Sequence, residues 1–232
     1  MLVCVIPGFG QRAYCGLANP GQCVRDVVKD EAGVWTSPTR LKRKDLVWLA
    51  PLAGATVLAF HFDTQAANAL GNNPILTHRS QQIAFFGSPQ MTAVSGAGLY
   101  LMGLGLRNKH LAETGRLSAE AVVDASLVAG AIKLATDRQR SGSGQSGFWP
   151  SGSPFVVNSS FPSGHATASW AIARVVASEY PKNRAVRIAA YGFAAAISVC
   201  RVTGRAHFPS DVVIGSALGY LIGGYVVRQR AE

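Results

Sequence analysis

The residues best suited to chemistry in this chain are two histidines, one carboxylate and three cations, gathered in three short clusters. They are Lys133 with Arg140, the run Pro162-Ser163-Gly164-His165, and Arg201 with His207 and Asp211. Fixed cations can hold a phosphoryl group, and one imidazole can attack it while a carboxylate orients that imidazole. The second imidazole can protonate the leaving oxygen. These residue types point to phosphoryl transfer without a metal.

The middle cluster predicts an anion site at a helix start. Ser163, Gly164 and His165 lie where a loop is expected to become a helix, so their backbone N–H groups are free and the helix dipole adds partial positive charge. Gly164 leaves room for a phosphate to approach the backbone. Arg201 offers a planar fork for two phosphate oxygens. We therefore expect Ser163, Gly164 and Arg201 to bind phosphate.

Lys133 and Arg140 are expected to add charge from a helix predicted over residues 117–137. Two residues seven positions apart differ by about 20° around a helix, so they share a face. Arg138 would point about 140° away from Lys133 on the same helix. We therefore assign phosphate binding to Lys133 and Arg140, and at best a secondary role to Arg138.

The last cluster predicts an oriented imidazole. His207 lies just before Pro209, a residue favoured at the first position of a helix. Asp211 would then lie in the first turn, where its carboxylate can reach back to His207. A carboxylate in that place fixes the imidazole tautomer and stabilises the imidazolium, as in catalytic triads. Each cluster alone is a common arrangement, and the three together in this order carry the assignment.

Read as K-x6-R, P-S-G-H and R-x5-H-x3-D, the clusters resemble the motifs of the type 2 phosphatidic acid phosphatase and vanadium haloperoxidase superfamily, which includes the bacterial nonspecific acid phosphatases. The resemblance implies that His207 forms a phosphohistidine and that His165 protonates the leaving oxygen, then activates water. Ser141 stands where the family usually has proline, and Cys200 where it usually has serine. We expect these departures to affect loop geometry and packing rather than chemistry.

The charge balance indicates an anionic partner. The 22 Lys and Arg residues outnumber 12 acidic residues and give a formal charge of +10. No nucleic-acid motif occurs, and aromatic residues are not interleaved with the basic ones. Phosphorylated small molecules or lipids, or an anionic membrane surface, explain the charge better. The oligomeric state is not readable from the sequence.

Helical periodicity predicts an all-α fold, a single bundle with its active site at helix ends and connecting loops. Residues 1–45 are expected to form an irregular arm, and residues 46–232 a helical phosphatase domain with its motifs within 133–211. The predicted helices cover 46–62, 117–137, 162–179, 185–202 and 209–228, and the uncharged run 83–106 is divided by Pro89 and several glycines. A turn is expected at Asn72-Asn73-Pro74, and residues 141–161 are expected to form a loop.

Membrane insertion is less clearly indicated. Only the uncharged run 83–106 has the length of about 20 apolar residues that a span requires. The runs 46–62 and 212–227 are borderline, and mean hydropathy is only +0.19. We expect a soluble or membrane-associated bundle in the bacterial cell envelope, periplasmic or at the membrane, with an integral membrane protein as the alternative.

Several other residues have open or minor roles. Cys15 and Cys23 can form a disulfide if the chain is exported, or remain thiols. The aromatic side chains of the 141–161 loop either roof the pocket or pin the loop to the bundle; they are Phe148, Trp149, Phe155 and Phe161. The remaining histidines lack partners at recognisable spacing and are expected to lie outside the site; they are His61, His78 and His110.

The sequence therefore favours a metal-independent phosphatase acting on phosphomonoesters or on lipid phosphates and diphosphates. No metal or other cofactor is expected, and vanadate is expected to inhibit. One alternative is a vanadate-dependent haloperoxidase, in which the same pocket would hold vanadate as cofactor. The other is a non-catalytic helical envelope protein with a vestigial pocket.

Overall fold

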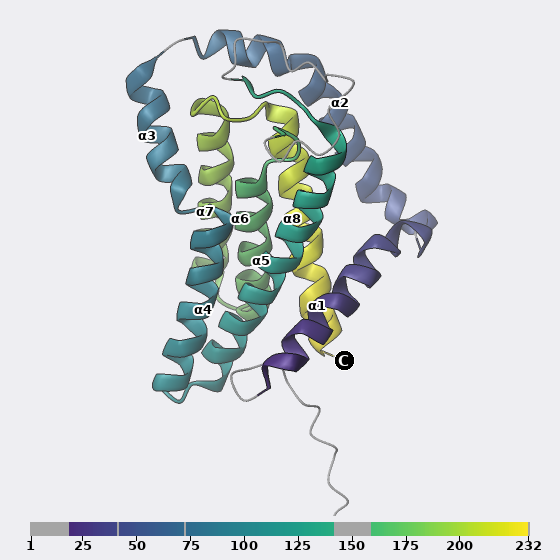
Figure 1. The fold of residues 1–232 in the computed structure, drawn as a ribbon, viewed down its shortest axis with the longest axis vertical. Coiled ribbons are helices and arrows are strands. Elements are labelled where there is room, and N and C mark those ends of the chain that lie inside the picture. Colours follow the sequence, from purple (N-terminus) through teal and green to yellow (C-terminus); the bar gives the residue numbers. More distant parts are fainter. Residues whose placement is uncertain (1–18, 41, 72, 142–158, 232) are drawn as a thin grey trace, which may run out of the picture.

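The chain folds into long helices that run side by side (Figure 1). The computed structural model describes residues 19–40, 42–71, 73–141 and 159–231. The α-helices are α1 (Pro20–Trp35), α2 (Leu46–Ala69), α3 (Pro74–Phe85), α4 (Pro89–Gly105), α5 (Lys109–Thr136), α6 (Gly164–Glu179), α7 (Arg184–Thr203) and α8 (Pro209–Ala231). Two short 3-10 helices, η1 (Ser37–Arg40) and η2 (Arg43–Asp45), join α1 to α2. These ranges contain no β-strand, which confirms the all-α prediction.

Helix α6 lies at the centre, packed against α5, α7 and α8. Small residues let the helices approach closely, as the Gly215, Gly219 and Gly223 pattern of α8 indicates. A Cβ at Gly219 would lie 2.0 Å from the backbone oxygen of Thr167 in α6. Alanine, valine, leucine and isoleucine side chains of α5, α6 and α8 form the main apolar core. The core thus fixes the relative positions of the helix ends that carry the site residues.

We expect Gly219→Ala to lower the free energy of unfolding by about 1–3 kcal/mol, because a methyl group would push α6 and α8 apart. Gly192→Ala on α7 is the matched control, since a Cβ there meets nothing within 4 Å. That control should be neutral or stabilising by up to about 1 kcal/mol. Unfolding in detergent measures both, and equal stability of the two variants would contradict the packing argument.

Several helix starts follow from local chemistry. Asn73, Ser88 and Asn108 each accept a hydrogen bond from the backbone N–H three residues later. Side-chain caps of this kind satisfy one of the N–H groups left free at a helix start. Ser88 and Pro89 therefore begin α4 and separate it from α3. The uncharged run 83–106 is therefore divided before Pro89, as the sequence indicates, between the end of α3 and α4.

Helix α5 corrects a prediction from the sequence. It begins at Lys109, eight residues before the predicted start at 117, and ends at Thr136. Asp137 adopts a left-handed backbone conformation with φ of 38°, which ends the helix. Arg138 and Arg140 therefore lie beyond the helix, and the shared helical face predicted for Lys133 and Arg140 is wrong.

The arm predicted to be irregular over residues 1–45 contains helix α1, so that part of the prediction is wrong from Pro20 to Trp35. The acidic face of α1 is buried against the bundle, where Arg230 of α8 donates a 2.8 Å bond to Asp30. Figure 1 shows α1 crossing α8 near the C-terminal end of the chain. Cys23 is disulfide-bonded, whereas its predicted partner Cys15 lies outside the described residues.

The apolar surfaces of the outer helices associate the protein with a membrane. Three helices are long and apolar enough to cross one: Leu46–Ala69, Arg184–Thr203 and Pro209–Arg230. Only 6% of the α2 window is buried, and Val47 is 79% exposed. Exposed apolar surface on this scale would be unstable in water. The soluble option is therefore disfavoured, and α2, α7 and α8 replace the divided 83–106 run as candidate spans.

Candidate active site

The three sequence clusters meet at one end of the bundle. Helix α5 ends there, and α6 and α8 begin there, at the upper end of Figure 1. Two backbone hydrogen bonds join the segments: Ser163 donates to Asp211 over 3.0 Å, and Ser160 donates to Arg138 over 2.7 Å. Residues up to 78 positions apart in the chain thereby form one site.

His207 and Asp211 form the oriented pair that the sequence predicts. Nδ1 of His207 lies 3.6 Å from Oδ2 of Asp211, and both side chains are almost completely buried. The same carboxylate oxygen accepts hydrogen bonds from Ser160 Oγ at 2.5 Å and from the Phe208 backbone N–H at 2.8 Å. A carboxylate beside Nδ1 keeps a proton on that nitrogen and leaves Nε2 as the basic atom.

Burial keeps the imidazole of His207 uncharged. It lowers the pKa of His207 to about 4, with Arg201 acting in the same direction and the nearby Asp211 carboxylate partly opposing both. A buried imidazole favours its neutral form because the charged form loses hydration. At neutral pH, His207 therefore presents a lone pair that can attack phosphorus.

His165 lies in the first turn of α6, close to the same cations. Burial, together with the nearby Arg201, His207, Arg140 and Lys133, lowers the pKa of His165 to about 3. His165 is therefore neutral at neutral pH. A phosphate dianion placed among these cations would reverse the local charge and raise the pKa of His165. Protonation of this imidazole is thus coupled to occupancy of the site by an anion.

The start of α6 has the features of an anion cradle. Helix α6 begins at Gly164 with Ser163 as its N-cap residue. The Ser163 hydroxyl oxygen is buried and has no hydrogen-bond partner among the described residues. A Cβ at Gly164 would find its nearest neighbour, Lys133 Cε, 3.9 Å away. The backbone N–H of Ser163 donates to the Asp211 carbonyl, so the expectation that it is free is wrong. The N–H groups of Gly164 and His165 in the first turn lie beside a lysine and an unused hydroxyl.

The predicted cations come from three segments. Lys133 leaves α5 and donates from Nζ to the Ser159 carbonyl at 2.6 Å. Arg201 is at the end of α7, is 8% exposed, and its Nε has no partner within the part of the chain that the structure describes. Arg140 is half-buried beyond α5, and its charge acts on both Lys133 and Arg201. The carboxylate that acts on Lys133 and Arg140 is Asp211. Three cations near one carboxylate favour the binding of an anionic ligand.

Arg138 is the residue whose importance the sequence underestimates. Its guanidinium donates to Asp211 Oδ1 at 2.5 Å and to Asp63 Oδ2 at 2.6 Å. It also donates to Ser210 Oγ at 2.7 Å and stacks 4.6 Å from the ring centre of Phe208. The side chain is only 3% exposed. The helical direction used to discount Arg138 does not apply, because α5 ends before it.

Asp63 and Ser160 were not predicted at all. An aspartate within the apolar segment of α2 is itself a signal, because a charge in such a segment needs a functional or structural partner. Ser160 precedes the P-S-G-H run and carries no signal in a single sequence. Of the loop aromatics, Phe161 lies 6.1 Å from Phe60 of α2, ring centre to ring centre. Residues 148, 149 and 155 lie outside the described residues.

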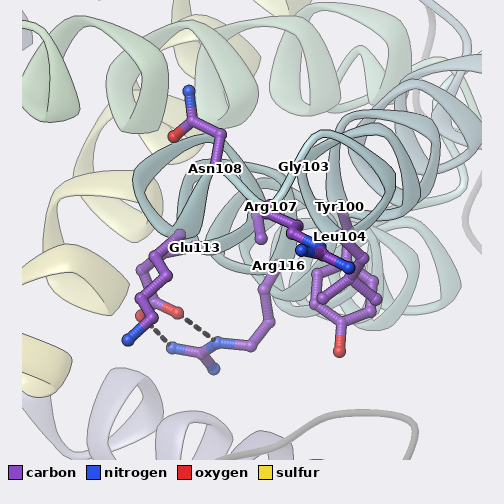
Figure 2. A pocket seen from close by; sticks show the side chains of 9 residues that line it. Tyr100, Gly103, Leu104, Arg107, Asn108, Glu113 and Arg116 are labelled. Carbon is purple, nitrogen blue, oxygen red and sulfur yellow. Dashed lines mark hydrogen bonds and ion pairs between the residues drawn. The ribbon is translucent and has the colours of Figure 1, made fainter.

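Two further findings bear on other sites. Within the described ranges, no group of three or more His, Cys, Asp or Glu side chains has an arrangement that could hold a metal ion. A hollow of about 350 Å³ lies between α4 and α5 at the opposite end of the bundle, and it contains none of the predicted site residues. Figure 2 shows its lining, where Arg116 Nε donates to Glu113 over 2.9 Å.

Comparison with known proteins agrees with this geometry. The PAP2 superfamily model matches residues 119–232. The fold is similar to the crystal structure of a transmembrane PAP2-type phosphatidylglycerolphosphate phosphatase from Bacillus subtilis, with a TM-score of 0.51 and 19% identity. That match covers 93% of this chain and 97% of the other. No curated protein matches the sequence. Residues 119–232, which contain all three clusters, therefore belong to the PAP2 superfamily.

Proposed function

We propose that this membrane-associated phosphatase cleaves phosphate from a monoester or a lipid phosphate or diphosphate through a phosphohistidine on His207. The supporting observation is the position of His207. Asp211 lies at its Nδ1, and the charges of Arg201 and Lys133 act on the same ring. Such a ring has one nitrogen held by a carboxylate and the other available to a phosphoryl group bound by cations.

In the first step, Arg201, Arg140 and Lys133 bind the phosphoryl oxygens together with the N–H groups at the start of α6. Nε2 of His207 attacks phosphorus, and the phosphorus–oxygen ester bond breaks. His165, protonated once the anion is bound, gives its proton to the leaving oxygen. Asp211 stabilises the positive charge that develops on the His207 ring.

In the second step, water attacks the phosphorus of the phosphohistidine. His165, now neutral, takes a proton from that water, and the phosphorus–nitrogen bond to His207 breaks. Inorganic phosphate leaves and both imidazoles return to their starting states. His207 is thus the nucleophile in the first step and the leaving group in the second. His165 acts as the acid in the first step and as the base in the second.

A lipid phosphate is the substrate class that the surroundings favour. The site is at the ends of α7 and α8, two of the candidate membrane spans. A lipid substrate anchored in the bilayer could place its phosphate at the ends of these helices without leaving the membrane. The Bacillus subtilis neighbour is described as a phosphatidylglycerolphosphate phosphatase, which makes that lipid a suitable first substrate to assay. The periplasmic location of the site stays a prediction.

We expect activity to survive exhaustive chelation with EDTA and to be inhibited by orthovanadate. The three cations supply the charge that a metal would supply elsewhere. Vanadate can become five-coordinate with His207 as a ligand, which resembles the transfer state and favours tight binding. The measurement is hydrolysis of p-nitrophenyl phosphate after chelation, with a vanadate titration. Loss of activity restored by magnesium or zinc, or indifference to vanadate, would refute this mechanism.

The same assay tests the role of His165 through the leaving group. We expect His165→Ala to slow hydrolysis of an alkyl phosphate by about 10²–10⁴-fold, because the alkoxide needs a proton to leave. p-Nitrophenyl phosphate should be affected much less, since its phenolate leaves unprotonated. Comparison of kcat/KM for the two substrates measures the difference. Equal losses on both would show that His165 is not the acid.

A further inference from the structure

Behind the His207–Asp211 pair lies a second layer of buried charges from three separate segments. Asp63 comes from α2, Arg138 from the stretch after α5, and Asp211 from α8. Arg138 bridges the two carboxylates, at 2.6 Å from Asp63 Oδ2 and 2.5 Å from Asp211 Oδ1. The three side chains are 4%, 3% and 0% exposed. At such burial, solvent does little to weaken the interactions among them.

The two oxygens of Asp211 have different partners. Oδ2 faces His207 and accepts from Ser160 Oγ and the Phe208 N–H, whereas Oδ1 accepts from Arg138. Arg138 therefore holds the oxygen that His207 does not use, and this fixes the rotation of the carboxylate. Without that bond, Asp211 could turn away from the imidazole that it has to orient.

Asp63 preserves the negative charge that His207 faces. Arg138 and Asp211 alone would sum to zero, and a neutralised Asp211 would stabilise an imidazolium poorly. With Asp63 the triad carries one net negative charge. Asp63 Oδ1 also accepts from the Ser210 backbone N–H at 3.0 Å in the first turn of α8. One side chain of α2 thus sets both the charge and the position of the helix start that carries Asp211.

We propose that Asp63 and Arg138 are positioning residues for the nucleophile, and that they act through Asp211 to set the charge and orientation of His207. This inference rests on the proposed function. The other charged groups that face His207 come from the remaining helices of the site: Arg201 of α7, Lys133 of α5 and His165 of α6. None of these groups is altered in the test that follows.

The test uses variants of matched shape that change charge in opposite directions. Asp63→Asn removes one negative charge behind Asp211, which disfavours protonated His207 and should move the acidic limb of the kcat/KM profile to lower pH. Arg138→Gln removes one positive charge and should move that limb to higher pH. Each shift should be about one pH unit. The double variant restores the net charge and should bring the limb back towards its wild-type position.

Two controls separate this effect from general damage. Asp63→Glu keeps the charge and should leave the limb in place. The second control is Asp45→Asn. Asp45 directly precedes α2 and accepts a hydrogen bond from the Lys42 backbone N–H. This variant should leave both the acidic limb and kcat/KM unchanged. A purely structural role would lower activity without moving the limb. Shifts in the same direction for Asp63→Asn and Arg138→Gln would also overturn the proposal.

A second measurement does not need activity. In ¹⁵N-histidine NMR of the detergent-purified chain, the resonance missing from His207→Ala identifies His207. Its titration midpoint should fall in Asp63→Asn and rise in Arg138→Gln. If wild-type protein hydrolyses no phosphate ester, the proposed function fails, yet these midpoints still test the positioning layer. If the titration midpoint of His207 is the same in wild type and in both folded single variants, the positioning role of Asp63 and Arg138 is refuted, even if the phosphatase activity is confirmed.

Discussion

Replacing His207 by alanine is expected to abolish phosphate hydrolysis altogether, because the reaction would lose the atom that forms the covalent intermediate. Activating groups modulate a rate, whereas loss of the nucleophile removes the pathway. The side chain is 2% exposed, so folding has to be checked by thermal unfolding in detergent. The assay is hydrolysis of p-nitrophenyl phosphate and of phosphatidylglycerolphosphate. A folded variant with near wild-type turnover would show that another residue is the nucleophile.

Asp211→Asn is expected to reduce kcat by about 10²–10⁴-fold while leaving the nucleophile in place. An amide retains the shape of the carboxylate, but it can no longer stabilise positive charge on His207. It also leaves Arg138 facing one carboxylate instead of two. Both oxygens of Asp211 accept hydrogen bonds, whereas an asparagine side chain has one acceptor oxygen, so a buried donor loses its partner and some stability should be lost as well.

The control for Asp211→Asn is Ser160→Ala, which removes one hydrogen bond to the same carboxylate but keeps its charge. Its stability should also fall, whereas its kcat should fall much less than that of Asp211→Asn. Steady-state kinetics and thermal unfolding of the two variants separate the catalytic from the structural contribution. Equal losses of kcat in the two variants would mean that the charge of Asp211 does not contribute to catalysis.

The starts of the helices at the candidate site could be anticipated from single residues. Pro209 at the first position of α8 placed Asp211 in its first turn, as the His207–Asp211 contact confirms. The P-S-G-H run likewise marks the start of α6 at Gly164. These are local effects, in which a residue determines the conformation of its own neighbourhood.

The second layer of charges could not be anticipated, because its contacts are long-range. Arg138 and Asp63 are 75 positions apart. Arg138 reaches Asp63 only because Asp137 adopts a left-handed conformation that ends α5. Aspartate tolerates that conformation but does not require it. The predicted end at residue 137 lies one residue from the observed end at Thr136, but the change in chain direction there is not visible in the sequence. A helical direction calculated past the true end then discounted the residue that holds Asp211.

The membrane interaction was underestimated for a different physical reason. Mean hydropathy averages over the whole chain, including its charged segments, and gives only +0.19. What matters to a bilayer is the surface that remains exposed after folding. Helix α2 buries almost none of its apolar side chains against the bundle. That outward orientation depends on which helices pack together, and a single sequence does not contain this information directly.

The central claim is that the phosphoryl group passes through His207, and trapping the intermediate tests it most directly. Purified protein is mixed with ³²P-labelled p-nitrophenyl phosphate, quenched with base within milliseconds, and digested for mass spectrometry. The account predicts an acid-labile, base-stable label on His207, formed also in His165→Ala and absent from His207→Ala. Label on another residue, or full turnover with no labelled enzyme at any time, would contradict it.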